Sequence, residues 1–369
     1  MRLRGLAGQP RAVAALSRAF ETGRFHPSLI FHGPAGAGKL TGALALSRSL
    51  LCVAKEDDPC GACHACRRID AASMRHPDVR VVLPEKLEDF RKGEIAEEGV
   101  SGIDVQERQA IACRNPVWTI LIDRVRDAIA FVNRRPAEGL RRVLILDQAH
   151  RMGAEAANAL LKTLEEPPEH AILVLLTPSH HALLPTLRSR CQAVPFLSIP
   201  AGTIATFLQA EHGMAEEEAR FRAALAGGRI GTAADLDLEA FRERREALLT
   251  RLESFLRPPD AGQAVARAEE LAKSGESGEA DLEILGSLLR DRMILRAAGP
   301  GAPGLVHADI ARRLLNLPAR EGRDGTDPVL RLESALEGIR RKGNRQLLIE
   351  DVFLELLPDD GSSAARPVP

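Results

Sequence analysis

A glycine-rich segment near the N-terminus constrains the fold of this chain more than any other feature. Residues 33–41 read GPAGAGKLT and match the pattern G-x-x-x-x-G-K, directly after a β-type run at 28–32 and directly before a helical apolar pattern. In that setting backbone N–H groups and the helix N-terminus cradle phosphate oxygens, and Lys39 reaches the terminal phosphates. The segment predicts a P-loop on an α/β frame, against the alternative of a chance glycine-rich turn.

The P-loop departs from its usual pattern at one position. The residue after Lys39 is normally Ser or Thr, whose hydroxyl binds Mg²⁺, and here it is Leu40. Thr41 comes next, but one helical step turns a side chain by about 100°. We therefore expect phosphate binding without efficient metal-assisted chemistry. The expected phosphate-binding residues of the loop are Gly33, Gly36, Gly38, Lys39 and Thr41.

A second motif follows in the run 143–147 (VLILD), an apolar strand that ends in the carboxylate of Asp147. It has the form of a Walker B strand, in which the acid holds Mg²⁺ through water. The next residue of such a site is usually Glu, and here it is Gln148, whose amide can orient water but cannot take its proton. Gln148 could also be an ordinary polar residue at a strand end. Together with Leu40 it predicts a degenerate site for ATP or phosphate, without independent hydrolysis.

Further strands and helices alternate along the first half of the chain. Continuous apolar runs at 79–83 and 171–176, together with helical spacing at 154–165, predict a parallel sheet covered by helices on both faces. After Pro200 the β pattern ends, and helical patterns continue to 357. The polar, charged stretch at 84–109 is typical of a surface loop and indicates no function.

These patterns predict the domain boundaries. We expect a P-loop domain with an inserted cysteine module, a small helical domain, a second all-helical domain and a disordered tail. The expected boundaries are 1–199, with the module at about 52–66, then 200–256, 257–358 and 359–369.

Four cysteines follow the P-loop helix with the spacing C-x7-C-x2-C-x2-C. They are Cys52, Cys60, Cys63 and Cys66. Four thiolates satisfy one tetrahedral Zn²⁺ and leave no open coordination position, so the pattern predicts a structural zinc site. Redox-active C-x-x-C pairs, or replacement of one thiolate by His64, are the alternatives. The other two cysteines, Cys113 and Cys191, are expected to be lone buried thiols.

Composition excludes several classes of protein. The chain has 369 residues, a formal net charge of −1, 11 Phe, one Trp and no Tyr. It is neither basic enough to coat DNA nor aromatic enough to stack extended single strands, so any nucleic-acid contact must be local or shared with partner chains. No signal peptide and no long apolar run are visible, which predicts a cytoplasmic protein without membrane contact.

The stretch from the second motif to residue 191 resembles the clamp-loader branch of the AAA+ ATPases. The similarity lies in Asn158, in LEEPP at 164–168 and in SRC at 189–191, with GQ at 8–9 near the start. Within that branch the chain is most similar to the delta-prime group of bacterial DNA polymerase III, because HPD at 76–78 and RPAEG at 135–139 are typical of that group. The resemblance is strong over residues 6–200 and continues weakly to about 357.

The resemblance implies a non-motor subunit, or stator, of a DNA polymerase III clamp loader. Such a subunit joins gamma/tau and delta subunits in a hetero-pentameric ring that loads the sliding clamp onto primed DNA, within the holoenzyme of a DNA-directed DNA polymerase. It sends an arginine finger, here Arg190, into the ATP site of its neighbour, where a guanidinium suits γ-phosphate charge. Outside a ring, Arg190 would be a surface charge or one half of an intrachain ion pair.

The resemblance also assigns the remaining positions. Thr177, at the end of the strand at 171–176, falls on the sensor-1 position. Gly231 falls where a motor subunit has its sensor-2 arginine, with Arg229 two residues earlier. A zinc module is a family feature, and the segments 200–256 and 257–358 correspond to a lid and a collar. An active gamma/tau-type motor subunit and a zinc-stabilised recombination or repair adaptor are the alternative functions.

Overall fold

The computed structural model describes residues 6–22, 25–54, 59–70, 74–85, 118–257, 259–274, 276–302, 304–318, 328–340 and 343–357. Nearly all of the charged stretch at 84–109, together with Cys113 and the tail at 359–369, lies outside these residues. The chain divides into two compact units, Met1–Asp235 and Leu236–Pro369. Each unit is described by itself.

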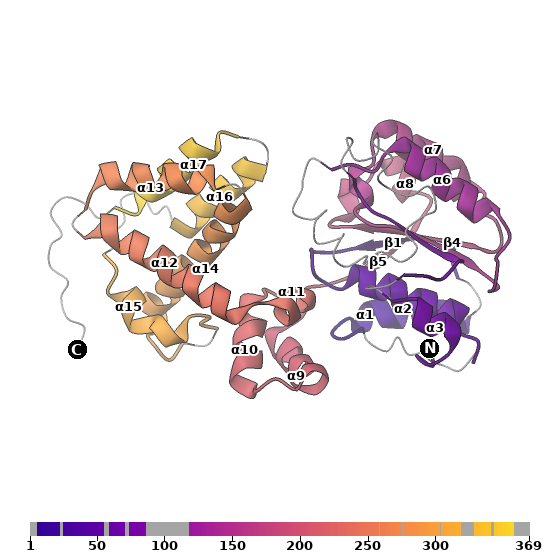
Figure 1. Ribbon diagram of the computed structural model, residues 1–369, viewed down its shortest axis with the longest axis horizontal. Coiled ribbons are helices and arrows are strands. Elements are labelled where there is room, and N and C mark those ends of the chain that lie inside the picture. The colour runs from indigo at the N-terminus through magenta and orange to yellow at the C-terminus, as the bar shows by residue number, and fades with distance from the viewer. Residues whose placement is uncertain are drawn as a thin grey trace. The chain divides into compact units, whose positions relative to one another are not determined.

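The first unit is built on a five-stranded sheet in which all neighbouring strands are parallel (Figure 1). Its strands, in chain order, are β1 (Ser28–His32), β2 (Val79–Val82), β3 (Arg142–Leu146), β4 (Ala171–Thr177) and β5 (Gln192–Pro195). In space their order is β2-β3-β4-β1-β5. The central strands β3 and β4 are buried at every residue, because a parallel sheet is covered on both faces. The predicted α/β P-loop fold is confirmed.

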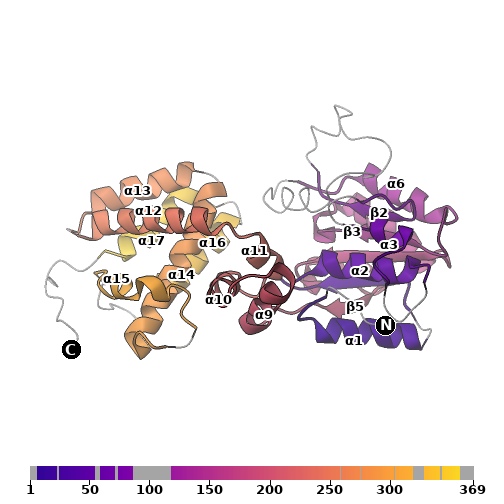
Figure 2. The same cartoon turned by 60° about the horizontal axis from the view of Figure 1, so that its bottom comes forward.

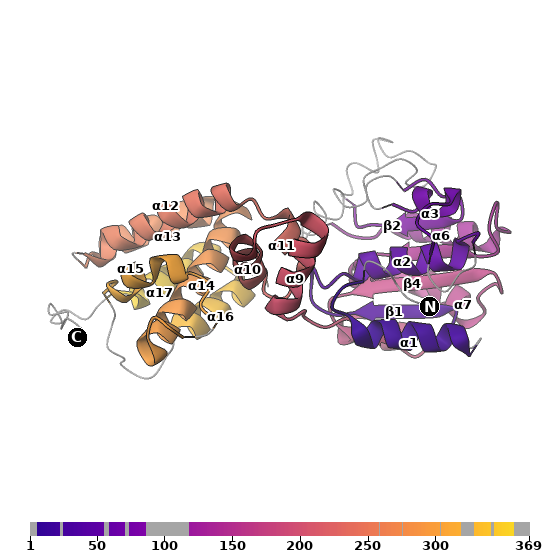
Figure 3. The ribbon, with the colours of Figure 1, turned by 90° about the horizontal axis from the view of Figure 1, so that it is seen from below.

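Helices cover both faces of this sheet (Figures 1 and 3). One face carries α1 (Pro10–Glu21), α2 (Lys39–Leu51) and α3 (His64–Arg68), and the other carries α6 (Ile122–Asn133) and α7 (Ala154–Glu165). Because successive strand residues point to opposite faces, Phe31 packs with the first set of helices and its neighbour Ile30 with the second. The sheet therefore lies between two separate apolar layers.

Local sequence sets the ends of α7, which has the predicted bounds. The helix begins after Gly153 and ends at Glu165, just before Pro167 and Pro168, whose rings cannot continue a helix. Leu160 and Leu164 lie one turn apart and are buried against the sheet.

A small helical group completes the first unit (Figure 2). It consists of α9 (Ala201–His212), α10 (Glu216–Leu225) and α11 (Ile230–Asp235). These helices bury an apolar core of their own, to which Ile204, Leu208 and Ala223 contribute. α9 ends at His212 and is followed by Gly213, whose φ of 64° is the left-handed conformation that favours glycine after a helix.

The described residues of the second unit form helices and connecting turns, without a strand. Its helices are α12 (Leu238–Leu256), α13 (Ala261–Lys273), α14 (Glu276–Ala298), α15 (Ala311–Leu315), α16 (Pro328–Arg340) and α17 (Arg345–Glu355). The sequence placed α12 in the lid segment 200–256. Its apolar face, including Leu248, Leu252 and Phe255, instead packs in the core of the second unit, so the first unit ends at Asp235. None of the helices that the structure describes is long and apolar enough to cross a membrane.

Candidate functional site

The P-loop joins β1 to α2 as expected, and close contacts explain two of its glycines. Gly36 and Gly38 have φ values of 72° and 84°, in the left-handed region. A Cβ on Gly33 would collide with the carbonyl oxygen of Phe196, and a Cβ on Gly36 would lie 2.6 Å from Cβ of Arg229. The glycines are therefore required for the shape of the loop, whether or not a phosphate binds.

The first turn of α2 has no hydroxyl at the position directly after Lys39. Lys39 donates through Nζ to the carbonyl oxygens of Gly33 and Pro34, each at 2.7 Å. Leu40 is only 7% exposed and packs in the core of the first unit, while Thr41 is exposed. A buried hydrocarbon side chain thus takes the place next to Lys39 where a Mg²⁺-binding hydroxyl is needed.

Gln9 connects the P-loop to the chain that follows β5. Its amide nitrogen donates to the carbonyl oxygens of Ala37 and Leu197, at 3.0 and 2.6 Å, and its amide oxygen accepts from the backbone N–H of Leu197 at 3.0 Å. Gly8 has a φ of 72°, and a Cβ on it would collide with Ile199. The GQ pair of the sequence therefore holds the P-loop in place.

The second acidic motif and the sensor position lie at the carboxyl ends of the strands, where ligands of parallel sheets bind. Thr177 is fully buried, pairs with His32 in the sheet, and accepts through its carbonyl oxygen from the N–H of Gly33 at 3.2 Å. Asp147 follows β3, the strand beyond β4, and is 2% exposed. Gln148 has a φ of 50°, an uncommon conformation for a residue with a side chain. The structure thus brings Thr177 against the start of the P-loop, with Asp147 at the same edge of the sheet.

Histidines that sequence reasoning missed lie near Lys39. His32 ends β1, and its ring centroid lies 5.5 Å from that of His180. Burial, with the nearby His180 and Lys39, lowers the pKa of His32. Burial, with the charges of Arg151 and Lys39, lowers the pKa of His150 to about 4. At neutral pH the rings of His32 and His150 are uncharged. Their placement at the carboxyl ends of β1 and β3 is the sequence signal that could have identified them.

The four predicted metal ligands come together. The Sγ atoms of Cys52, Cys60, Cys63 and Cys66 all lie within 4.8 Å of one another. Four thiolates around one Zn²⁺ stand about 3.8 Å apart, given Zn–S bonds of about 2.3 Å. Backbone N–H groups point at the sulfur atoms, from Cys60 to Cys52, from Cys63 to Cys60 and from Cys66 to Cys63, at 3.3 to 3.4 Å. The cluster could therefore hold one metal ion with small adjustments.

The thiols differ in acidity. Burial opposes ionisation of Cys63, but hydrogen bonds from the backbone N–H groups of Cys66 and Val53 outweigh it and lower the pKa of the Cys63 thiol to about 6. Burial, with the hydrogen bond to Cys63, raises the pKa of Cys66 to about 12. Outside the cluster, Cys191 was expected to be a lone buried thiol; it is half-buried, and burial raises the pKa of its thiol to about 12.

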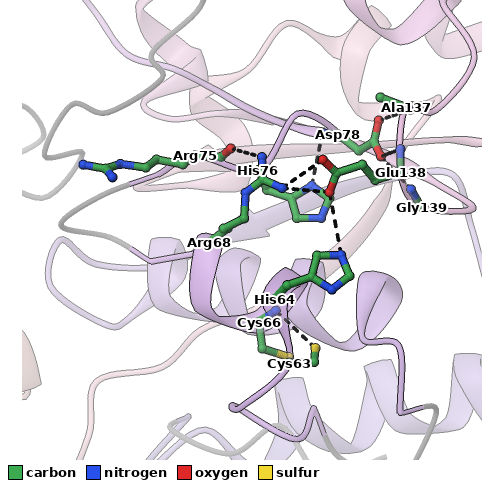
Figure 4. Close-up of polar contacts among 10 residues, drawn as sticks. All are labelled: Cys63, His64, Cys66, Arg68, Arg75, His76, Asp78, Ala137, Glu138 and Gly139. Atoms are coloured by element: carbon green, nitrogen blue, oxygen red, sulfur yellow. Dashed lines mark hydrogen bonds and ion pairs between the residues drawn. The ribbon is translucent and has the colours of Figure 1, made fainter.

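A chain of polar contacts connects the cysteine module to the sheet (Figure 4). Arg68, the last residue of α3, donates to both carboxylate oxygens of Glu138, at 2.9 and 2.8 Å. The Nε2 atom of His64 lies 3.7 Å from Glu138, and His64 is not part of the group of thiols. This geometry favours four cysteines over a set that includes His64.

Asp78 connects the HPD and RPAEG motifs of the sequence (Figure 4). Its carboxylate is fully buried and accepts from the backbone N–H groups of Ala137, Glu138 and Gly139, at 2.6, 2.9 and 2.8 Å. Burial opposes ionisation, but these N–H donors outweigh it and lower the pKa of Asp78. The loop before β3 is therefore anchored to the start of β2.

Arg190 lies in the turn between α8 (Pro185–Arg188) and β5, and 33% of its side chain is exposed. Its Nε donates to Oε1 of Glu165 at 2.7 Å, and Nη2 contacts the same oxygen. Nη1 donates to the carbonyl oxygen of Thr186 at 2.9 Å and to the hydroxyl of Ser189 at 3.2 Å. Arg190 is thus accessible and, in the chain alone, also part of an intrachain ion pair.

Arg229, in the turn between α10 and α11, lies beside the P-loop. The start of its side chain lies against Gly36, and its Nε donates to the carbonyl oxygen of Ala226 at 2.9 Å. Gly231 has open space around the position of a Cβ. Arg229 therefore approaches the P-loop, whereas Gly231, where the resemblance places a sensor-2 arginine, has no side chain.

Fold and site together define a class of protein. A parallel sheet in the order β2-β3-β4-β1-β5, with a P-loop after β1, an acid after β3 and a buried threonine ending β4, is an AAA+ domain. The small helical group that follows the sheet belongs to the same architecture.

Comparison with known proteins identifies the family. The family described as "DNA polymerase III, delta subunit" matches residues 8–200, and the chain belongs to it. The delta′ subunit of Bacillus subtilis is 31% identical over 188 residues, 51% of this chain and 47% of that protein. The gamma/tau subunit of Mycobacterium tuberculosis is 31% identical over 204 residues, 55% of this chain and 30% of that protein. The chain thus spans about half, or less, of the length of these relatives.

A solved structure can also be aligned with most of the chain. A gamma subunit-related protein from Thermotoga maritima covers 94% of this chain and 99% of its own, at 21% identity and a TM-score of 0.44. Among the sequence relatives, the delta′ and gamma/tau subunits match at equal identity. The choice between their roles therefore depends on the site itself.

Proposed function

We propose that this chain is a non-motor clamp-loader subunit of DNA polymerase III, a stator that sends Arg190 into the ATP site of a neighbouring gamma/tau-type subunit. In this role it joins gamma/tau and delta subunits in a hetero-pentameric ring that places the sliding clamp on primed DNA. Leu40 carries the proposal, because a buried hydrocarbon stands where hydrolysis needs a Mg²⁺ ligand.

Two further features of the same site support loss of hydrolysis. Gln148 stands where an active site has its general base, and an amide cannot accept the proton of the attacking water. The ammonium of Lys39 donates to carbonyl oxygens of the loop, so an entering phosphate has to compete with them. The glycines and the N-terminus of α2 still form a phosphate cradle. ATP binding without turnover is the behaviour that this arrangement favours.

The remaining elements take supporting roles in the proposal. The cysteine cluster binds a structural Zn²⁺, since four thiolates complete a tetrahedral shell and leave no position for a substrate. The group α9–α11 serves as the lid, and the second unit serves as the collar through which ring subunits associate.

The test is ATP turnover by the purified full chain and by a ring reconstituted from this chain with gamma/tau and delta subunits. We expect no turnover by the chain alone, and DNA-stimulated turnover by the ring that falls with Arg190→Ala. Turnover by the chain alone that Lys39→Ala abolishes would contradict the stator role. Equal activity of rings built with the unchanged chain and with the Arg190→Ala variant would refute the finger.

An active gamma/tau-type motor subunit is the second candidate. The intact Gly33, Gly38, Lys39 and Asp147 favour it, as does the 31% identity to a gamma/tau subunit. It requires metal-assisted hydrolysis in a site with Leu40 and Gln148. The same turnover assay on the purified chain separates the two candidates.

A further inference from the structure

We infer that Glu165 competes with the γ-phosphate of the neighbouring subunit for Arg190. The carboxylate holds the guanidinium in the free subunit and takes it back when the γ-phosphate is lost. This role rests on the proposed finger, and it makes Glu165 a positioning residue for the reaction in the adjacent site.

The contacts of the guanidinium are the first support. Arginine has five N–H donors. Glu165, Thr186 and Ser189 together occupy all but one of them in Arg190. Since arginine binds phosphate best through two parallel N–H groups, Arg190 must release at least one of these partners to engage a γ-phosphate.

The charge of Glu165 makes it the partner that leaves. Thr186 and Ser189 present neutral oxygens to Arg190, whereas Glu165 presents a carboxylate. An incoming triphosphate attracts the guanidinium and repels this carboxylate. After hydrolysis the γ-phosphate is gone, and Glu165 can pair with Arg190 again.

The position of Glu165 on its helix is the second support. Glu165 is the last residue of α7, where the helix end carries partial negative charge and disfavours an acidic side chain. Its side chain is 48% exposed, so packing in the core does not explain why a glutamate occupies this position. The ion pair with Arg190 is the interaction that offsets the unfavourable helix position.

The exposure of Glu165 sets the expected size of the change in binding. A partly exposed ion pair contributes modestly, so removing it should change an association constant by about two- to fivefold. The increase in the association constant should require both Arg190 and a γ-phosphate. If one of the two is missing, Arg190 does not exchange Glu165 for a phosphate.

The test measures association of the full chain with a gamma/tau subunit loaded with a non-hydrolysable ATP analogue or with ADP. Glu165→Gln should bind the analogue-loaded subunit about two- to fivefold more tightly than the unchanged chain, and the ADP-loaded subunit equally well. Glu166→Gln is the matched control, because this neighbouring residue is also exposed and the change removes the same charge. The gain should vanish when Glu165→Gln is combined with Arg190→Ala.

Two results separate this inference from the proposed function. If Arg190→Ala weakens association with the analogue-loaded subunit while Glu165→Gln behaves like Glu166→Gln, the competition is overturned and the finger stands. If Arg190→Ala changes neither association nor ring activity, the finger itself is refuted. Weaker binding by Glu165→Gln, with a thermal unfolding curve equal to that of Glu166→Gln, also overturns the competition.

Discussion

The P-loop and the turn that carries Arg190 belong to one domain, and they treat their charged side chains in opposite ways. In the P-loop, Lys39 donates to carbonyl oxygens of its own loop and the next side chain, Leu40, is buried. In the turn, Arg190 is held by surface groups and keeps a third of its side chain exposed. The ammonium of the P-loop is bound by the loop's own carbonyl oxygens, whereas the guanidinium of the turn is partly exposed at the surface.

The difference separates residues that the fold needs from residues that it does not need. Gly33 and Gly36 have no room for a Cβ, so the P-loop keeps its shape for structural reasons even if no nucleotide is hydrolysed. The fold makes no such demand at position 190, where the partners of the side chain lie at the surface. Arg190 is therefore the stronger indication of function.

Loss of Arg190 is the largest expected effect. Arg190→Ala should lower ATP hydrolysis at the adjacent site by about a thousandfold or more, because an arginine finger stabilises the charge of the transferred phosphoryl group. The measurement is single-turnover hydrolysis by a ring in which the neighbouring subunit has the one competent P-loop. Arg126→Ala, at an exposed arginine of α6, is the control. A rate for Arg190→Ala close to that of the control would contradict the role of Arg190 and, with it, the functional difference between the turn and the P-loop.

The cysteine cluster is connected to the P-loop by α2, because Cys52 directly follows this helix. We expect about one zinc ion per purified chain. Cys63→Ser should lose it and lower the free energy of unfolding of the first unit by several kcal/mol, because metal binding is coupled to folding. Metal analysis and thermal unfolding measure both effects. Cys191→Ser, outside the cluster, should keep the ion, and metal-free wild-type protein would remove the zinc claim.

Leu40 tests whether the P-loop can be repaired with one change. Leu40→Thr should cost about 2 kcal/mol of stability, because it removes buried apolar volume and buries a hydroxyl. It should not create ATP turnover, since Gln148 still cannot act as a base. Chemical denaturation and a phosphate-release assay measure the two outcomes. Thr41→Ser, at an exposed position, is the control for stability. Rapid turnover by Leu40→Thr alone would show that the metal ligand was the sole defect.

His150 gives the smallest expected effect. Its pKa is about 4 in the folded chain, below the ordinary value of about 6.5 for an unfolded chain, so the unfolded state binds the proton more readily. Stability of the first unit should therefore fall by about 1 kcal/mol between pH 7 and pH 5.5. His150→Asn should flatten this slope in denaturation curves. A slope equal to that of the unchanged chain would contradict the assigned environment of His150.

Much of the fold could be predicted because its signals are local. β3 and β4 are continuous apolar runs, α7 is bounded by Pro167, and the P-loop pattern lies between a strand and a helix. The cysteine spacing placed all four thiols in one group, since short loops leave them few alternatives. The sequence expected α12 in the segment 200–256, whereas its apolar face packs in the core of the second unit, because helical spacing does not say which core receives that face.

The contacts between distant side chains could not be predicted. Asp78 accepts from the loop at 137–139, and Arg68 pairs with Glu138, across long stretches of chain. The sequence showed these residues as separate motifs, without the hydrogen bonds that join them. The pairing of Arg190 with Glu165 was an open alternative for the same reason, since periodicity carries no information about partners in space.

The most direct measurement is phosphate release from Mg²⁺-ATP by the purified full chain, with Lys39→Ala as its reference. A closed P-loop with Leu40 and Gln148 predicts the same background rate for both proteins, while nucleotide binding by the unchanged chain is allowed. Steady turnover by the unchanged chain that disappears in Lys39→Ala would contradict the stator and assign the chemistry to its own P-loop.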